Sequence, residues 1–374
     1  MPNSGIIDLV IGLTFVFGVT AALSSAVTEL IARLLGLRGA YLLTGLRELV
    51  DGGNVTTDLG QAKTAYRDMQ DMVRTGQAPA DPAQVPSATG ALLGGPILSS
   101  QGMTGQISSR KLTLEPTAKE GRLPKMTADR QAGSLWGQRR SLPSYISSKS
   151  FTEAVIDLVV PDTAGQTTMD VIQVNVKALP ESPLSQSLQT LVKNAGGDIS
   201  QFRTGVERWY DDHMDRVSGW YKRHVAKVTL VVGAILVVLL NINALTIGRT
   251  LYTESTVSTA VSTAAANGAS CAGKNPQDCL AQLQGQLSAA ATAGLPIGWG
   301  TVRDCAELNA NCNYLDQRGI FSRHGDSGWQ LVLVLIGFLI MVIALVPGAQ
   351  FWFGLLSKLG TLRATGPKPA TAGT

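Results

Sequence analysis

Three long apolar stretches alternate with polar regions along the chain. They fall within residues 1–23, 228–248 and 329–346, and each is long enough to cross roughly 30 Å of hydrocarbon as a helix. Asp8 interrupts the first stretch, but it lies near one end, where its carboxylate can reach water. The pattern predicts a mainly α-helical integral membrane protein with three spans.

Basic residues flank these stretches unevenly, and this sets the expected orientation. No Lys or Arg precedes the first stretch, whereas several follow it, and basic residues also precede the second stretch and follow the third. Because cytoplasmic flanks carry the excess of Lys and Arg, the N-terminus and residues 249–328 are expected outside the cell and the C-terminus inside. The basic residues used are Arg33, Arg38, Arg47, Lys222, Arg223, Lys227, Lys358 and Arg363.

The cysteines fall where this orientation places an oxidising environment. All four lie in residues 249–328: Cys271, Cys279, Cys305 and Cys312. An even set of thiols on that side indicates two disulfides in a small helical outer domain. Three pairings are possible, and loop closure slightly favours the local one, Cys271 with Cys279 and Cys305 with Cys312. A zinc site is less well supported, since the sequence has no Cys-x-x-Cys or neighbouring His.

The polar regions differ in composition. Residues 24–74 carry short amphipathic patterns typical of helices near a membrane surface or in a bundle below it. Residues 75–149 are rich in Pro, Gly and Ser with little periodicity, which predicts a flexible insertion. Residues 150–227 return to helical patterns and form a cytoplasmic helical region, and residues 347–374 combine an aromatic interfacial segment with a cytoplasmic tail.

Helical spacing of apolar and aromatic positions continues from about residue 198 to residue 248. No proline interrupts it, so a single helix is expected, half cytoplasmic stalk and half membrane span. Within the stalk, Trp209-Tyr210-x-x-His213 recurs as Trp220-Tyr221-x-x-His224, and the spacing places both pairs on one face. This stripe is expected to pack against other cytoplasmic helices. The candidate interaction residues of the stalk are Trp209, Tyr210, Asp211, Asp212, Asp215, Arg216, Trp220 and Tyr221.

Asp211, Asp212 and Asp215 have the Asp-Asp-x-x-Asp spacing that holds magnesium in enzymes acting on lipid diphosphates. The hypothesis is minor, because no second acidic motif is present and three spans are few for such a site. We expect Glu207, Asp211 and Asp215 instead to form an acidic stripe neutralised by Arg33, Arg38, Arg47 or Arg203. Asp212 is expected to pair with Arg216 one turn on. No metal, cofactor or catalytic residue is predicted.

Asn241 and Asn243 are the polar residues expected within a span. Amides inside a membrane usually face protein or a water-filled path. Hydrogen bonding between helices is the favoured interpretation, and the lining of a pore built from several copies is the alternative.

Several strings of this sequence resemble those of a family of uncharacterised bacterial inner-membrane proteins. They are residues 142–146 before Phe151, the stalk motif of residues 209–223 ending in Met-Asp-Arg-Val-Ser-Gly-Trp-Tyr-Lys-Arg, residues 295–299, and Gly-Ala-Gln-Phe-Trp-Phe at 348–353. Members commonly carry Pro at the position of Gln350 and Asp at that of Gly354, where this chain departs. The resemblance implies a bacterial cytoplasmic membrane location and no particular activity or substrate.

Composition agrees with a membrane protein and narrows the function little. The chain is 45% hydrophobic and only 16% charged, and its net charge of +4 gives no basic patch of the kind that binds nucleic acid. Phosphate-binding loops and serine-nucleophile motifs are missing from the sequence. The leading hypothesis is therefore a non-enzymatic scaffold that forms homo-oligomers or anchors a cytoplasmic protein partner. An oligomeric channel or transporter subunit is the alternative.

Overall fold

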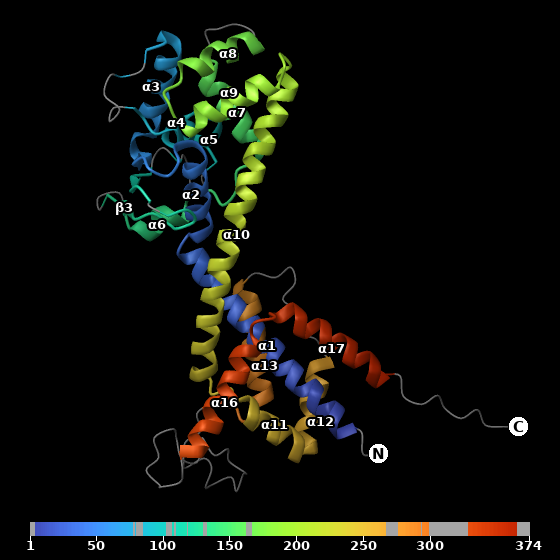
Figure 1. Cartoon of the computed structure of the whole chain (residues 1–374). Helices are drawn as coiled ribbons and strands as arrows, with labels where there is room; N and C mark the ends of the chain where they lie inside the picture. Colours follow the sequence, from blue (N-terminus) through green and yellow to red (C-terminus); the bar gives the residue numbers. More distant parts are fainter. Residues whose placement is uncertain are drawn as a thin grey trace, which may run out of the picture. The chain divides into compact units, whose positions relative to one another are not determined.

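The chain forms two compact units. The computed structural model describes residues 4–77, 79, 85–101, 107, 110–117, 119–129, 133–161, 167–266, 276–292, 294–298 and 328–364, and these are mainly helical (Figure 1). Unit 1 comprises residues Met1–Ile31 and Val225–Thr374, and unit 2 comprises Ala32–His224. Two helices, α1 (Ser4–Leu34) and α10 (Ile199–Leu239), contribute residues to both units.

Unit 1 contains the helices that are apolar enough for a membrane. Besides the first part of α1 and the last part of α10, it holds α11 (Ala244–Thr253), α12 (Ser255–Ala266), α13 (Pro276–Thr292), α16 (Gly328–Ala344) and α17 (Ala349–Ala364). Residues Ile6–Leu34 of α1 form one helix that is long and apolar enough to cross a membrane. Two helix pairs also qualify if each counts as one bent span: α10 with α11, bent by 54°, and α16 with α17, bent by 92°. These features indicate association with a membrane.

The expected uninterrupted helix over residues 198–248 is wrong at its membrane end. Helix α10 ends at Leu239, and α11 begins at Ala244 in a different direction. Asn241 takes the left-handed backbone conformation, with φ of 47°, and Asn243 caps the start of α11. Asparagine is one of the few residues that adopt this conformation and also one of the best N-caps, so two asparagines end a helix here without a proline.

The described part of residues 249–328 has no separate hydrophobic core. Val257 and Val261 of α12 and Leu283 and Leu287 of α13 are buried in the same cluster as apolar side chains of α1 and α16. The small outer domain expected for this region is therefore not a distinct body in its described part. Cys271, Cys305, Cys312 and the side chain of Cys279 lie outside the described residues, so the disulfides stay a prediction.

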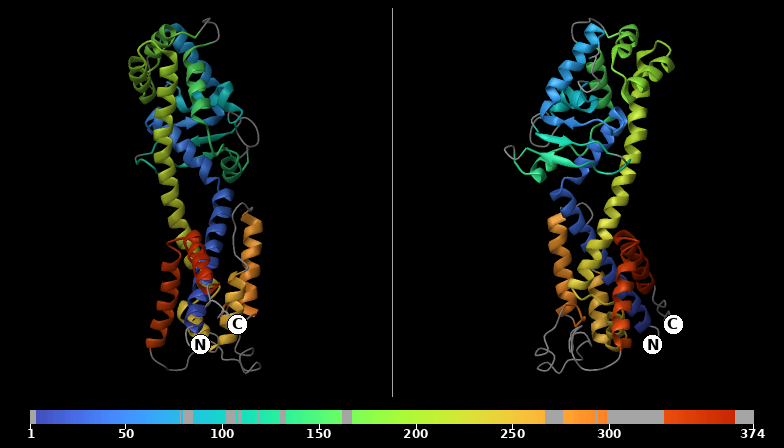
Figure 2. Two further views of the ribbon diagram at one scale, coloured as in Figure 1. Left: turned by 90° about the vertical axis from the view of Figure 1, so that its right-hand side faces the viewer. Right: turned by 60° about the vertical axis from the view of Figure 1, so that its left-hand side comes forward.

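Unit 2 packs short helices and one small sheet around a core of its own. The helices are α2 (Leu37–Asp51), a 3-10 turn η1 (Leu59–Gln61), α3 (Ala62–Thr75), α4 (Ala88–Gly94), α5 (Pro96–Ser99), α6 (Leu135–Arg140), α7 (Ser148–Val159), α8 (Met169–Ala178) and α9 (Pro183–Asn194). The antiparallel sheet has the order β1 (Thr57–Asp58), β2 (Leu112–Leu114) and β3 (Met126–Ala128). Figure 2 shows this unit from two further sides.

The flexible insertion expected at residues 75–149 is wrong for its described part. This region supplies α4, α5, α6, β2 and β3, and Leu92, Leu98 and Leu112 are fully buried in the core of unit 2. Asp51, at the end of α2, accepts hydrogen bonds from the Ser87 hydroxyl at 2.7 Å and from the first backbone N–H groups of α4. The helices and strands of this region are too short to show a periodic pattern in the sequence. The proline-rich segments that connect them dominate its composition, which is why the sequence predicted a flexible insertion.

Helix boundaries in the rest of unit 2 follow local signals. Ser182 and Pro183 start α9 with a capping box, and Asp198 accepts a hydrogen bond from the backbone N–H of Ser200 at the start of α10. Helix α7 begins after Ser147, a few residues earlier than the expected start at Ser150. Helix α2 is largely buried in unit 2, which supports its place in a bundle rather than on a surface.

Candidate functional site

A groove of about 250 Å³ runs along the aromatic face of the stalk in unit 2. Its walls come from α2, from the segment of residues 144–146 before α7, and from α10. The lining combines four tyrosines, two carboxylates, one arginine and several apolar side chains: Arg38, Tyr41, Leu42, Ser144, Tyr145, Ile146, Tyr210, Asp211, Met214, Asp215, Val217, Ser218 and Tyr221. We call this surface the stalk groove.

Tyr210 fixes the wall formed by residues 144–146. Its ring stacks on Phe151 with centroids 4.5 Å apart, and its hydroxyl donates a hydrogen bond to the carbonyl oxygen of Ile146 at 2.9 Å. Burial raises the pKa of the Tyr210 hydroxyl, so the group stays a neutral donor. Trp209, beside it, lies against the same Phe151 with centroids 6.1 Å apart. These contacts hold the segment that presents Tyr145.

Tyr221 forms the other end of the groove together with α2. Its ring meets Tyr41 edge-on with centroids 5.7 Å apart. The guanidinium carbon of Arg38 lies 5.9 Å from the Tyr221 ring centroid, and Arg38 Nε donates to the Tyr221 hydroxyl at 3.2 Å. A cation over the face of an aromatic ring is attracted by the ring's quadrupole. The groove thus already holds one guanidinium on a tyrosine.

His213 joins α10 to α2 behind the groove. Its Nε2 lies 2.9 Å from the carbonyl oxygen of Gly45, and Arg216 Nη2 lies 3.0 Å from its Nδ1. These partners assign the neutral tautomer with hydrogen on Nε2, since arginine can only donate. Burial, and then the charge of Arg216, lower the pKa of His213. Trp220 meets the imidazole edge-on, with centroids 6.1 Å apart. The aromatic stripe of α10 therefore packs within unit 2.

Three aspartates of the stalk, Asp211, Asp212 and Asp215, are exposed. Asp211 and Asp215 line the groove, and Asp212 is exposed beside them. Among the described residues none of the three forms an ion pair. The expected Asp212–Arg216 pair is wrong, because Arg216 turns to His213.

Three of the four arginines expected to neutralise this stripe contact other groups. Arg203 pairs with Glu153, and the buried Arg47 donates to the carbonyl oxygen of Gly53 at 2.5 Å. Arg38 is directed to Tyr221, as described above. Asp211 and Asp215 therefore face the groove together with Arg38, and neither forms an ion pair with another described residue.

A shared site for a metal ion is not formed by these acids. Within the part of the chain that the structure describes, no group of three His, Cys, Asp or Glu side chains converges on one point. Asp211, Asp212 and Asp215 come from a single helix, and a magnesium site needs further oxygen ligands placed around the ion.

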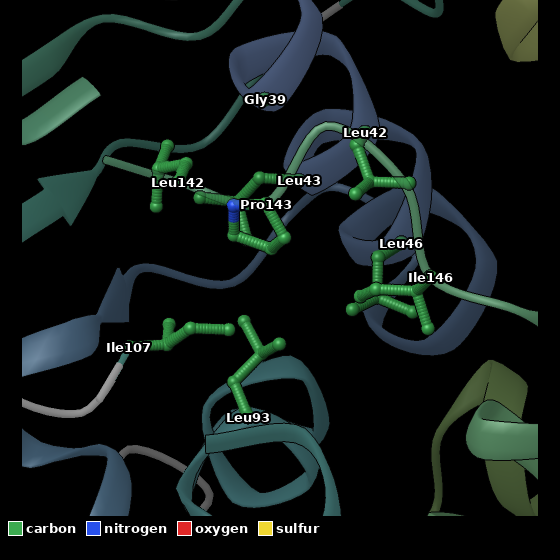
Figure 3. A pocket seen from close by; sticks show the side chains of 9 residues that line it. All are labelled: Gly39, Leu42, Leu43, Leu46, Leu93, Ile107, Leu142, Pro143 and Ile146. Carbon is green, nitrogen blue, oxygen red and sulfur yellow. The ribbon is translucent and has the colours of Figure 1, made fainter. Parts of the chain in front are cut away.

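A small apolar cavity lies behind the groove wall. It measures about 10 Å³ and shares Leu42 and Ile146 with the groove (Figure 3). Its other lining residues are also apolar or backbone: Gly39, Leu43, Leu46, Leu93, Ile107, Leu142 and Pro143. Such a space has no polar partner for a water molecule, and it is too small for a ligand. It belongs to the packing that supports the groove.

Asn241 and Asn243 in unit 1 are buried and hydrogen-bonded to backbone groups. Asn243 Nδ2 donates to the carbonyl oxygen of Val334 in α16 at 3.0 Å, while its Oδ1 accepts from the N–H groups of Leu245 and Thr246. Asn241 Nδ2 donates to the carbonyl oxygen of Gly298 at 2.9 Å. Both side chains are buried within unit 1. This geometry agrees with the favoured interpretation, hydrogen bonding between segments.

The sequence singled out the stalk side of the groove but missed the opposite wall. Arg38, Tyr41 and Tyr145 were not predicted as site residues, because their proximity to α10 depends on long-range packing. Tyr145 lies two residues after Pro143 in the short segment before α7, and the structure leaves its side chain 73% exposed. Comparison of the chain with known protein families, with curated proteins and with solved structures gives no match.

Proposed function

We propose that this chain is a non-enzymatic membrane anchor that holds a cytoplasmic protein partner in the stalk groove of unit 2. The observation that supports this most is that one groove combines the exposed Tyr145 with the carboxylates of Asp211 and Asp215, which form no ion pair among the described residues. Aromatic side chains are enriched at protein interaction surfaces, whose rims are polar. The apolar helix α1 supplies the attachment to the membrane.

The anchor is proposed to cross a bacterial cytoplasmic membrane three times, with the N-terminus outside and unit 2 inside. Support comes from the basic residues that flank the apolar stretches and from the two bent helix pairs that qualify as further spans. The four cysteines are proposed to form two disulfides on the outer side.

Reporter fusions after residues 140 and 265 test the proposed topology: an enzyme active only outside the cell should be active at 265 and inactive at 140. The reverse result would contradict it.

Site-specific photo-cross-linking in native membranes tests the docking function. A benzoylphenylalanine at position 145 should give a reproducible adduct with one other protein. The matched control places it at position 174, since Val174 is 66% exposed on α8 of the same unit. No adduct at 145, or the same adducts at both positions, would contradict the proposal. An adduct at twice the 39.4 kDa mass of the chain would show self-association instead of an outside partner.

A further inference from the structure

We infer that the stalk groove recognises an arginine or lysine side chain of the partner. This inference rests on the proposed docking function and specifies its chemistry. The groove has the two features that a cationic side chain requires, namely carboxylates to pair with the charge and aromatic faces to cover the aliphatic stem. Both are present within one surface of about 250 Å³.

The charge of the groove favours a cation. Asp211 and Asp215 are one helical turn apart on the same face of α10, and both line the groove. Arg38 is the one basic side chain in the lining, and its guanidinium lies over Tyr221. Since the described residues supply no ion pair to either aspartate, an incoming cation has two carboxylates to bind.

The aromatic lining fits the same ligand. Arg38 over the Tyr221 ring shows the contact that a guanidinium makes in this groove. Tyr145 offers a second ring, and its 73% exposure leaves its face open to a partner. Met214, which is partly exposed in the groove, adds apolar surface against which the methylene groups of a long basic side chain can lie.

The tyrosines of the groove differ in burial, and this assigns their roles. Tyr210 and Tyr41 are buried and fixed by Phe151, Ile146 and Tyr221, so they form a rigid floor. Tyr145 lies at the rim. A rigid floor with charged and aromatic groups at the rim loses little side-chain entropy when a ligand binds.

Peptide binding to the full-length protein in lipid nanodiscs tests this inference. The probes are the N-acetylated, C-amidated tripeptide Gly-Arg-Gly and its citrulline counterpart, which has the same shape without the charge. Titration by saturation-transfer NMR should show binding of the arginine peptide, weakened by salt, and binding of the citrulline peptide weaker by about tenfold or more. Equal affinity for the two peptides would overturn the inference.

Matched protein variants locate the site. Asp211→Asn with Asp215→Asn should weaken binding of the arginine peptide by about tenfold or more, because two charged acceptors are lost. Asp170→Asn, an equally exposed change on α8, should leave binding unchanged. Unchanged affinity in the double variant, or an equal loss in the control, would overturn the assignment to the groove.

A repeat of the cross-linking separates this inference from the docking function itself. With the photo-reactive residue at position 145, the partner adduct should be lost when Asp211 and Asp215 are replaced by Asn. If the adduct persists, the docking function stands and the cationic specificity is wrong. If no adduct forms in either background, the docking function is wrong. An adduct with lipid, or with a second copy of the chain, would also overturn the inference.

Discussion

Nε2 of His213 lies 2.9 Å from the carbonyl oxygen of Gly45, and this contact joins α10 to α2 directly behind the stalk groove. The two helices approach closely here because Gly45 has no side chain. A Cβ atom at this position would lie 2.3 Å from Cγ2 of Val217. The position and orientation of the groove walls therefore depend on this crossing.

Gly45→Ala should destabilise the protein. The added methyl group collides with Val217, a β-branched side chain with few alternative rotamers, and such overpacking costs about 1–3 kcal/mol. Gly219→Ala is the matched control, since the nearest atom to its Cβ would be Arg223 Nη1 at 3.8 Å. It should be neutral or stabilising by up to about 1 kcal/mol, because alanine favours a helix. Equal unfolding midpoints of the two purified variants would show that the crossing is not tight.

Acidification should destabilise the surroundings of His213, because a proton on Nδ1 removes the acceptor that faces Arg216 and brings two cations together. The pKa of His213 is lowered in the folded state, so between that value and the unfolded value of about 6.5 the unfolded chain binds the proton first. Stability is then fully present above pH ~6.5 and falls as the pH drops toward the folded pKa. Thermal unfolding measured across this range should show the loss. His213→Gln should reduce this loss of stability, whereas His224→Gln, which changes an exposed side chain, should leave the loss as it is in the parent protein. The same pH slope in His213→Gln would contradict this assignment.

The order of the proline-rich region depends on Asp51. Its buried carboxylate accepts from the Ser87 hydroxyl and from the N–H groups of Ala88 and Thr89 at 2.7, 2.7 and 3.1 Å. Asp51→Ala leaves these donors without a partner and should lower the free energy of unfolding by about 1.5–3 kcal/mol. Hydrogen exchange should rise in residues 88–99. Asp68→Ala, which changes an exposed side chain on α3, should leave the free energy of unfolding and the hydrogen exchange unchanged. Fast hydrogen exchange of residues 88–99 in the parent protein would contradict the ordered structure of this region.

Asn243 should matter for stability rather than for transport. Asn243→Ala removes the cap of α11 and the bond to Val334, which should cost about 1–2 kcal/mol in detergent. Arg249→Ala, an exposed change on the same helix, serves as the control. Flux of ions through reconstituted vesicles should be insignificant in both the parent and the variant. A flux that the variant abolishes would instead support the channel hypothesis.

Local signals predicted the parts of the structure that depend on neighbouring residues. The apolar stretches predicted helices that are long enough to cross a membrane. Ser182 followed by Pro183 is a local signal for the start of a helix, and α9 begins there. Parts that depend on distant contacts were missed. The strands of the sheet are two or three residues long, too short for an alternating pattern, and they pair across tens of residues. The break at Asn241 was missed because the surrounding apolar spacing is helical and Asn241 is fixed by Gly298.

The stalk groove shows the same division. Helical periodicity placed Tyr210 and Tyr221 on one aromatic face and Asp211 and Asp215 in one acidic stripe, but it assigned the aspartates to arginines such as Arg47 and Arg203, which the structure directs elsewhere. The opposite wall comes from residues 38–42 and 144–146. Its place beside α10 depends on Tyr210 bonding to Ile146 and on Gly45 meeting Val217, two contacts between residues far apart in the chain.

Recruitment of the partner to the membrane tests the central claim most directly. Tyr145→Arg puts a bulky cation at the rim of the groove, where it can occupy the carboxylates without touching the core. The protein cross-linked at position 145 is quantified in membrane fractions that contain equal amounts of the parent chain, Tyr145→Arg or Val174→Arg. The account predicts that the partner leaves the membrane fraction only with Tyr145→Arg. A partner that remains on the membrane with Tyr145→Arg would contradict it.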